Sequence, residues 1–168
     1  MFSIIAAVSK NNGLGMKGVI PWKEPDDMLF FRGMTSNTFD KTRQNAVIMG
    51  RLTYESFKGR SLPNRKMIII SSQENINPDW FNNLDAALDS LCNDSIEQIF
   101  VIGGGQLYSE AIRNNRCMKI YLNHINTDAE CDVFFPVIDG DVYELCSETP
   151  LTPNILARQY RNKHLQLS

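Results

Sequence analysis

One carboxylate in the sequence has the surroundings that proton-transfer chemistry requires. Asp27 lies in the segment 25–34, and Pro25 suits the first position of a helix. At about 100° per residue, the summed direction of the apolar side chains in 28–34 falls almost on Asp27, whereas Asp26 points roughly 100° away. Asp27 is therefore predicted to face the protein interior.

A buried carboxylate without a partner is costly and has a raised pKa, so this acid needs a specific role. It can pair with a cation, or it can bind a polar ligand and move protons. The structural alternative is an acid that only compensates the helix dipole from the first turn. Met28 and Phe31 are its neighbours, and such side chains equally suit a pocket for a flat ring.

Three predicted strands end in groups that can hold a phosphate. Strand 98–102 runs into consecutive glycines and then into a helical pattern, and glycines allow backbone N–H groups to approach an anion closely. Strands 46–49 and 66–70 end in cationic, hydroxyl and amide side chains, which also bind phosphate or ribose. The residues at the three ends are Gly50, Arg51, Thr53, Ser71, Ser72, Gln73, Gly103, Gly104, Gly105 and Gln106.

Together these ends favour a dinucleotide, because the carboxyl ends of parallel strands meet at one edge of a sheet, where α/β proteins bind nucleotides. Each end has a structural alternative: the glycines suit a tight turn, and Arg51 alone suits a solvated surface charge. The glycine spacing is neither G-x-G-x-x-G, because Tyr108 stands where the last glycine would be, nor a P-loop, because no lysine follows.

The segment 13–22 is rich in glycine and ends in Pro21 and Trp22. It is too irregular to predict a strand. A glycine-bearing loop beside a site can act as a lid that excludes water from a reacting centre. The alternative is an ordinary connection with Trp22 anchored in the core.

Short apolar runs alternate with helical patterns along the chain, which predicts one α/β domain over residues 1–168 with helices on both faces of a mostly parallel sheet. The predicted strands are 2–8, 46–49, 66–70, 98–102 and 118–125. The predicted helices are 25–35, 53–57, 84–92 and 106–113. A terminal antiparallel hairpin is expected at 141–148 and 155–164, with surface loops at 35–45 and 72–83.

The composition argues against several classes of function. The 168 residues carry a net charge of −2 with no basic stripe, which disfavours nucleic acid as a partner. The four cysteines are scattered without C-x-x-C spacing, which indicates free thiols in a reducing compartment and no metal site. The apolar opening 2–8 is far shorter than a membrane span. We therefore expect a cytoplasmic protein without a membrane partner.

The whole set of residues resembles the dihydrofolate reductase family. The motifs that carry the resemblance are 4–8, Gly15, Pro21, Trp22, Asp27, Phe31, 47–51, 53–56, Leu62, Pro63, Arg65, 102–105, Tyr108 and 132–136. It implies a mixed, mostly parallel sheet of about eight strands flanked by helices. It also implies a monomer that reduces 7,8-dihydrofolate to 5,6,7,8-tetrahydrofolate with hydride from NADPH, in support of one-carbon and thymidylate metabolism.

The resemblance assigns roles at the substrate side. Asp27 would bind the pterin N–H donors and, directly or through water near Trp22, support protonation of the imine. That role agrees with the chemistry, because hydride addition to a neutral imine needs a proton and no histidine falls in these motifs. Arg65 would hold a carboxylate of the glutamate tail. The ring-binding wall would be Ile5, Ala7, Met28, Phe31, Phe57, Leu62 and Ile102.

On the cofactor side, the resemblance places the three strand ends around the phosphates and the adenine ribose, and the segment 15–20 as a lid over nicotinamide. The additional cofactor residues that it implies are Ala7, Gly15, Ile20, Leu107 and Tyr108.

Three positions depart from the family pattern. Leu52 and Gln106 stand where many relatives have another basic residue, so the charge facing the 2′-phosphate of NADPH rests mainly on Arg51. Each lost charged hydrogen bond is worth about 1.5–3 kcal/mol, which predicts weaker discrimination against NADH. Asn123 replaces a threonine whose hydroxyl bonds the catalytic carboxylate. An amide both donates and accepts, so Asn123 is predicted to take over that bond and to alter the pH profile.

Two other functions remain open on the sequence. The same architecture can reduce another pterin or an aminopyrimidine, which would not need Arg65. It can also be a binding module for folate or nucleotide that no longer turns over because Asn123 disturbs the site.

Overall fold

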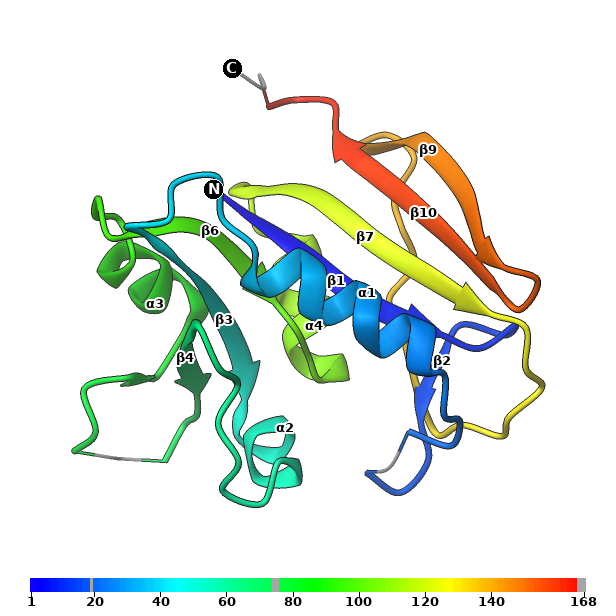
Figure 1. Ribbon diagram of the computed structural model, residues 1–168, viewed down its shortest axis with the longest axis horizontal. Helices are drawn as coiled ribbons and strands as arrows, with labels where there is room; N and C mark the ends of the chain where they lie inside the picture. The colour runs from blue at the N-terminus through cyan, green and yellow to red at the C-terminus, as the bar shows by residue number, and fades with distance from the viewer. Residues whose placement is uncertain (19, 74–75, 166–168) are drawn as a thin grey trace.

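The computed structural model describes residues 1–18, 20–73 and 76–165, and its centre is an eight-stranded sheet (Figure 1). In spatial order the strands are β5 (Trp80–Phe81), β4 (Arg65–Ile70), β3 (Gln44–Gly50), β6 (Ile96–Val101), β1 (Phe2–Val8), β7 (Cys117–Ile125), β10 (Ile155–Asn162) and β9 (Tyr143–Thr152). The helices are α1 (Pro25–Ser36), α2 (Arg51–Ser56), α3 (Leu84–Ser90) and α4 (Gly105–Ile112).

The sheet is parallel except at its C-terminal hairpin. β1 pairs in parallel with β6 and β7, and β3 pairs in parallel with β4 and β6. β10 runs antiparallel to both β7 and β9. The predicted fold class and terminal hairpin are therefore confirmed. The parallel pairing also places the carboxyl ends of β3, β4 and β6 at one edge of the sheet.

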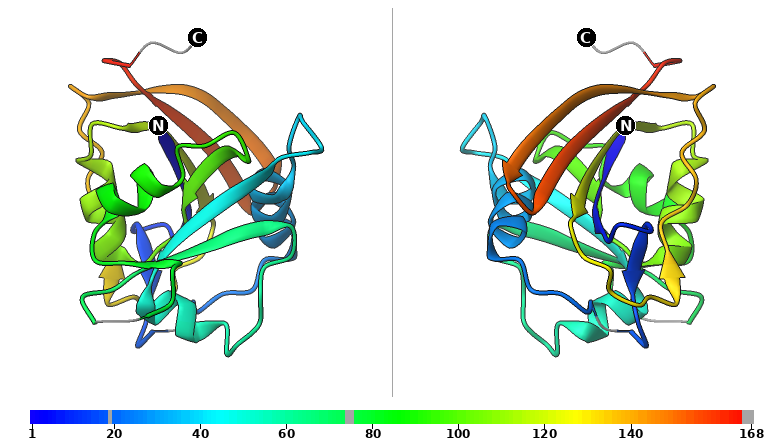
Figure 2. Two further views of the ribbon diagram at one scale, coloured as in Figure 1. Left: turned by 90° about the vertical axis from the view of Figure 1, so that its left-hand side faces the viewer. Right: turned by 90° about the vertical axis from the view of Figure 1, so that its right-hand side faces the viewer.

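Helices cover both faces of the sheet (Figure 2). Because side chains alternate along a strand, Ile4 of β1 belongs to the core cluster that includes residues of α3 and α4, whereas Ile5 belongs to the other cluster. Phe30, Phe31 and Met34 of α1 pack against that second cluster. Both faces are buried, which explains why the strands read as nearly continuous apolar runs.

Three short strands were not predicted. The prediction that 13–22 holds no strand is wrong at β2 (Gly13–Gly15), which pairs with β8 (Val133–Phe134) in a separate two-stranded sheet. The segment 72–83, predicted as a loop, contains the edge strand β5. The strands β2, β5 and β8 are only two or three residues long and lack a hydrophobic period of their own, so local patterns do not reveal them.

The apolar arc of α1 is narrower than the sequence suggested. Met28 is 69% exposed and Leu29 is 64% exposed, so the expectation that they point into the core is wrong. The packed side chains are Phe30, Phe31 and Met34. At about 100° per residue their summed direction still falls on Asp27, so the predicted placement of the acid survives the correction.

Other sequence-based expectations concern membranes and thiols. None of the helices in the described ranges is both long and apolar enough to cross a bilayer. All four cysteines are free thiols. Within the described residues, no three His, Cys, Asp or Glu side chains gather as metal ligands would.

Candidate active site

The inward-facing carboxylate of Asp27 is hydrogen-bonded to an amide 96 residues further along the chain. Asn123 Nδ2 on β7 donates a hydrogen bond of 2.9 Å to Asp27 Oδ1 on α1. Burial raises the pKa of Asp27 above its ordinary value, the bond from Asn123 partly offsets that rise, and the nearby charge of Glu24 adds to it. Asp27 therefore retains its proton to a higher pH than a solvated aspartate does.

The side chain of Asn123 is buried and donates its hydrogen bond to Asp27. The residue is 2% exposed, and its Oδ1 atom has no hydrogen-bond partner among the residues that the structure describes. It lies opposite Ala7 on β1 and Ala157 on β10. The bond between Asn123 and Asp27 is the interaction that the sequence predicted for this departure from the family pattern.

Apolar side chains predicted to line the substrate pocket gather on the same face of the sheet as α1. Five of them belong to the second core cluster or pack against it, namely Ile5, Phe31, Phe57, Leu62 and Ile102. Ala7 is half-buried beside Asn123. Met28 points to solvent, and its role as part of the wall stays a prediction.

Arg65 begins β4 and is held by two elements. Its Nε donates to the backbone oxygen of Pro63 and its Nη1 donates to Thr35 Oγ1 on α1, each at 3.0 Å. Burial and the nearby charge of Arg32 lower the pKa of Arg65, although a guanidinium remains protonated in proteins. Neither bond uses Nη2, so within the described residues these two bonds leave Nη2 of a half-buried cation available to a ligand.

The glycine run after β6 is joined to the end of β3. Gly50 N donates to the backbone oxygen of Gly103 at 2.9 Å. A Cβ atom at Gly104 would lie 3.4 Å from Thr53 Oγ1, and one at Gly105 would lie 2.5 Å from Val133 Cγ1. Gly104 caps α4 without a side-chain hydrogen bond, so the first N–H groups of α4 remain available to an anion.

Gly103 and Tyr108 fix the backbone conformation and the packing at the glycine run 103–105. Gly103 has a φ of +130°, a conformation that side chains other than glycine rarely adopt. Tyr108 is buried, and its hydroxyl donates to the backbone oxygen of Ile5 at 2.8 Å. Burial raises the pKa of Tyr108. Leu107 packs into the core, which leaves its backbone as the part that can meet a ligand.

The ends of β3 and β4 lie side by side. Gly50 is paired with Ile70, and the residues that follow these two paired ends are Arg51 and Ser71. Ser71 is buried and its Oγ accepts a hydrogen bond from Gln73 N at 3.1 Å. Ser72, Gln73 and Gln106 are exposed. The structure thus brings the three predicted phosphate-binding ends to one edge of the sheet.

The predicted lid is tied to β8 at its beginning. The backbone N–H of Asp132 donates to Gly15 at 2.9 Å, and Lys17 N donates to Asp132 Oδ2 at 3.0 Å. Ile20 is 63% exposed. Val19, which belongs to the same prediction, lies outside the described residues. Trp22 is half-buried in a connecting segment, and its catalytic role stays a prediction.

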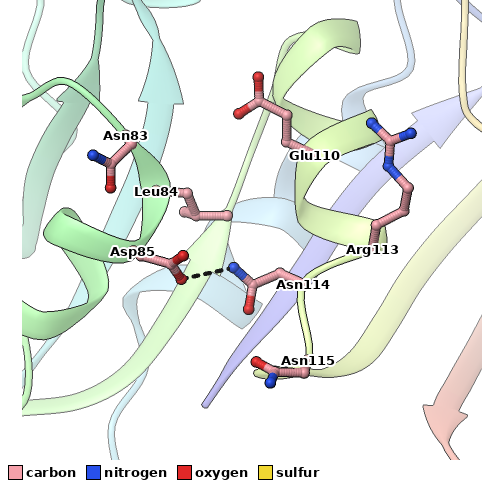
Figure 3. A pocket seen from close by; sticks show the side chains of 7 residues that line it. All are labelled: Asn83, Leu84, Asp85, Glu110, Arg113, Asn114 and Asn115. Atoms are coloured by element: carbon pink, nitrogen blue, oxygen red, sulfur yellow. Dashed lines mark hydrogen bonds between the residues drawn. The ribbon is translucent and has the colours of Figure 1, made fainter.

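A separate cavity of about 510 Å³ lies between α3 and α4, on the other face of the sheet (Figure 3). Its lining includes no residue of the predicted site, and Asn114 Nδ2 donates to Asp85 Oδ1 across it at 3.0 Å. The seven lining residues are Asn83, Leu84, Asp85, Glu110, Arg113, Asn114 and Asn115.

Two residues that the sequence analysis did not single out hold site residues in place. Thr35 bonds Arg65, and no local pattern could reveal a contact between residues 30 positions apart. Glu55 forms an ion pair of 2.7 Å with Arg51. That pair has the i, i+4 spacing of helical ion pairs and could have been found from the sequence.

Comparison with known proteins agrees with this geometry. The family model for dihydrofolate reductase matches residues 1–162. The chain is 35% identical to dihydrofolate reductase of Drosophila melanogaster, over 89% of this chain and 87% of that protein, and 38% identical to the same enzyme of Heliothis virescens, over 87% and 84%.

Plant relatives are much longer than this chain. It is 36% identical to bifunctional dihydrofolate reductase-thymidylate synthase 2 of Arabidopsis thaliana over 91% of its own length, and spans only 29% of that protein. The match over nearly the whole chain, together with the buried acid and the glycine-rich strand end, shows that the chain belongs to the dihydrofolate reductase family.

Proposed function

We propose that the protein reduces 7,8-dihydrofolate to 5,6,7,8-tetrahydrofolate with NADPH. The observation that carries this proposal is the half-buried Asp27, hydrogen-bonded to Asn123 and placed on the same sheet face as an aromatic and aliphatic cluster. An acid in apolar surroundings suits a flat heterocycle that has N–H donors and must gain a proton. Membership of the family supports the same activity.

The reaction adds a hydride to the carbon and a proton to the nitrogen of the substrate's C=N bond, giving CH–NH. NADPH supplies the hydride when bound. Asp27 orients the heterocycle through its N–H donors and keeps a proton available, because burial raises the pKa of this carboxyl. The adjacent apolar side chains exclude water from the reacting bond, which strengthens the contact between carboxylate and ring.

The carboxyl edge of the sheet fits the phosphates of NADPH. Close approach is possible because Gly103, Gly104 and Gly105 carry no side chains, and α4 offers uncapped N–H groups there. Arg51 and Ser71 directly follow the paired ends of β3 and β4, where a charged ribose phosphate would extend. This chemistry supports a dinucleotide with an additional phosphate.

Arg65 is proposed to bind the glutamate tail of folate. Its guanidinium is fixed by Pro63 and Thr35, so less side-chain freedom is lost when an anion binds. The same proposal describes a cytoplasmic monomer that serves one-carbon and thymidylate metabolism and has no nucleic-acid or membrane partner. Its net charge of −2 and its free thiols support that part.

The direct test mixes the protein with NADPH and dihydrofolate and follows the absorbance at 340 nm. We expect oxidation of NADPH at a turnover of about 1–1,000 per second, and no oxidation without dihydrofolate. Thermal stabilisation by both ligands without product would contradict the reductase and indicate a binding module. Turnover of a pterin without the glutamate tail, together with inactivity on dihydrofolate, would identify the related pterin reductase instead.

The hydrogen bond from Asn123 to Asp27 predicts in which direction the pH profile of kcat moves when that bond is removed. Replacing Asn123 with leucine removes the donor that lowers the pKa of Asp27, so that pKa is expected to rise further. The limb of the kcat profile that depends on protonated Asp27 should then move to higher pH. Steady-state rates measured across pH at saturating substrate check this shift.

The matched variant is Asn123→Thr, which restores a side-chain donor at the same position. We expect its limb to return toward that of the unaltered protein. If the leucine and threonine variants show the same profile as the unaltered protein, Asn123 does not control the proton on Asp27.

A further inference from the structure

The cation at the end of β3 is already paired with an acid. Arg51 Nη1 lies 2.7 Å from Glu55 Oε1, one helical turn further along α2. The side chains are 32% and 53% exposed, respectively, so solvent and ligands can reach the pair. An exposed ion pair of this kind is weak enough to be broken by a competing anion.

Arg51 is the single cation among the described residues at the three strand ends. These residues are 50–53, 71–73 and 103–106. Leu52 is 73% exposed and contributes none. Arg51 directly follows Gly50, which is paired with Ile70 of β4 and donates a backbone hydrogen bond to Gly103 of the glycine run.

Arg51 therefore lies between the part of the edge suited to a pyrophosphate and the hydroxyl-rich end of β4. A dinucleotide stretched along the edge brings any phosphate on its adenosine ribose to Arg51 and Ser71. A phosphate there must either displace Glu55 from Arg51 or remain close to its carboxylate, and both are unfavourable. A nucleotide without that phosphate leaves the pair intact.

We propose that Glu55 is a specificity-determining residue that competes with the 2′-phosphate of NADPH for Arg51 and so narrows the preference for NADPH over NADH. The inference rests on the proposed use of NADPH and names a residue that sets the preference for NADPH over NADH. Glu55 does not need to touch the nucleotide in order to act. Its ion pair with Arg51 weakens binding of the 2′-phosphate and does not weaken binding of NADH, which lacks that phosphate.

The test compares binding of 2′,5′-ADP and 5′-ADP, which differ only in the 2′-phosphate, by calorimetry on the full chain at low ionic strength. Glu55→Gln is expected to tighten 2′,5′-ADP by up to about fivefold and to leave 5′-ADP unchanged. The ratio of kcat/KM for NADPH over that for NADH should rise by a similar factor. Added salt should reduce the difference between the variant and the unaltered protein.

A matched control is available on the other face of the sheet. Asp89→Asn removes an acid from Arg116, a pair of 2.8 Å with side chains 67% and 36% exposed. This variant has the same net charge as Glu55→Gln and is expected to leave the ratio of the two affinities unchanged. An equal gain in both variants would show a long-range charge effect and overturn the role of Glu55.

A double variant tests whether the effect of Glu55 depends on Arg51. In an Arg51→Gln background, Glu55→Gln should tighten 2′,5′-ADP less than it does with Arg51 present, because only the repulsion between carboxylate and phosphate is then removed. An equal gain in the two backgrounds would contradict the proposal. Absence of binding by both nucleotides to the unaltered protein would overturn the dinucleotide site itself, whereas binding without reduction of dihydrofolate would overturn only the proposed activity.

Discussion

Asp27→Asn is expected to lower kcat with dihydrofolate by about 10²–10⁴-fold at neutral pH, the usual contribution of a positioned acid or base. The amide keeps the size of the carboxyl and can still pair with Asn123, but it can neither hold the proton nor accept two N–H donors from the ring. The loss should therefore appear in the chemical step, while nucleotide affinity remains close to that of the unaltered protein.

The pH dependence separates this role from a structural one. At low pH part of the substrate arrives already protonated, so the rate of Asp27→Asn should recover partly as the pH falls. Steady-state kinetics across pH, with nucleotide binding measured in parallel, checks both expectations. Asp26→Asn is the matched control, because Asp26 is exposed in the same helical turn and should tolerate the change. Full activity of Asp27→Asn at neutral pH would remove the acid from the mechanism.

Arg65→Leu is expected to weaken dihydrofolate binding by about ten- to a hundredfold, equivalent to about 1.5–3 kcal/mol for a lost charged hydrogen bond. The guanidinium is half-buried and already positioned by Thr35 and Pro63, so the carboxylate of the glutamate tail loses a prepared partner. A pterin without that tail should bind the variant and the unaltered protein nearly equally. Equilibrium titration with both ligands measures the difference.

Two comparisons make the result of Arg65→Leu specific. Arg113→Leu removes an exposed arginine beyond α4 on the other face of the sheet and should leave both affinities unchanged. Thermal unfolding of Arg65→Leu controls for the lost bond to Thr35. Equal affinity of the variant and the unaltered protein for dihydrofolate would show that Arg65 does not bind the tail and would favour a substrate without one.

The elements of the sheet could be predicted because they depend on local information. A strand buried on both faces reads as an apolar run, as β1 and β3 do, and the glycine run marks the beginning of α4. The helical period identified Asp27 as the inward acid of α1. Membership of the family also followed from motifs within the sequence, and the comparisons confirm it.

Other features depended on contacts between distant parts of the chain. The pairing of β2 with β8, the bond from Asn123 to Asp27 and the bond from Arg65 to Thr35 each join segments far apart in the sequence. The exposure of Met28 and Leu29 was missed because the period of a helix indicates a direction but not the width of the surface that will cover it.

The sequence by itself determined which residues can do chemistry, because residue type and local period are properties of neighbouring positions. Only the tertiary structure decided the protonation of Asp27 and the ion pairing of Arg51. Burial and the amide of Asn123 act in opposite directions on the proton of Asp27, and Glu55 occupies the cation that a phosphate would use. Such states depend on solvent exclusion and on interatomic distances, which arise only when the chain has folded.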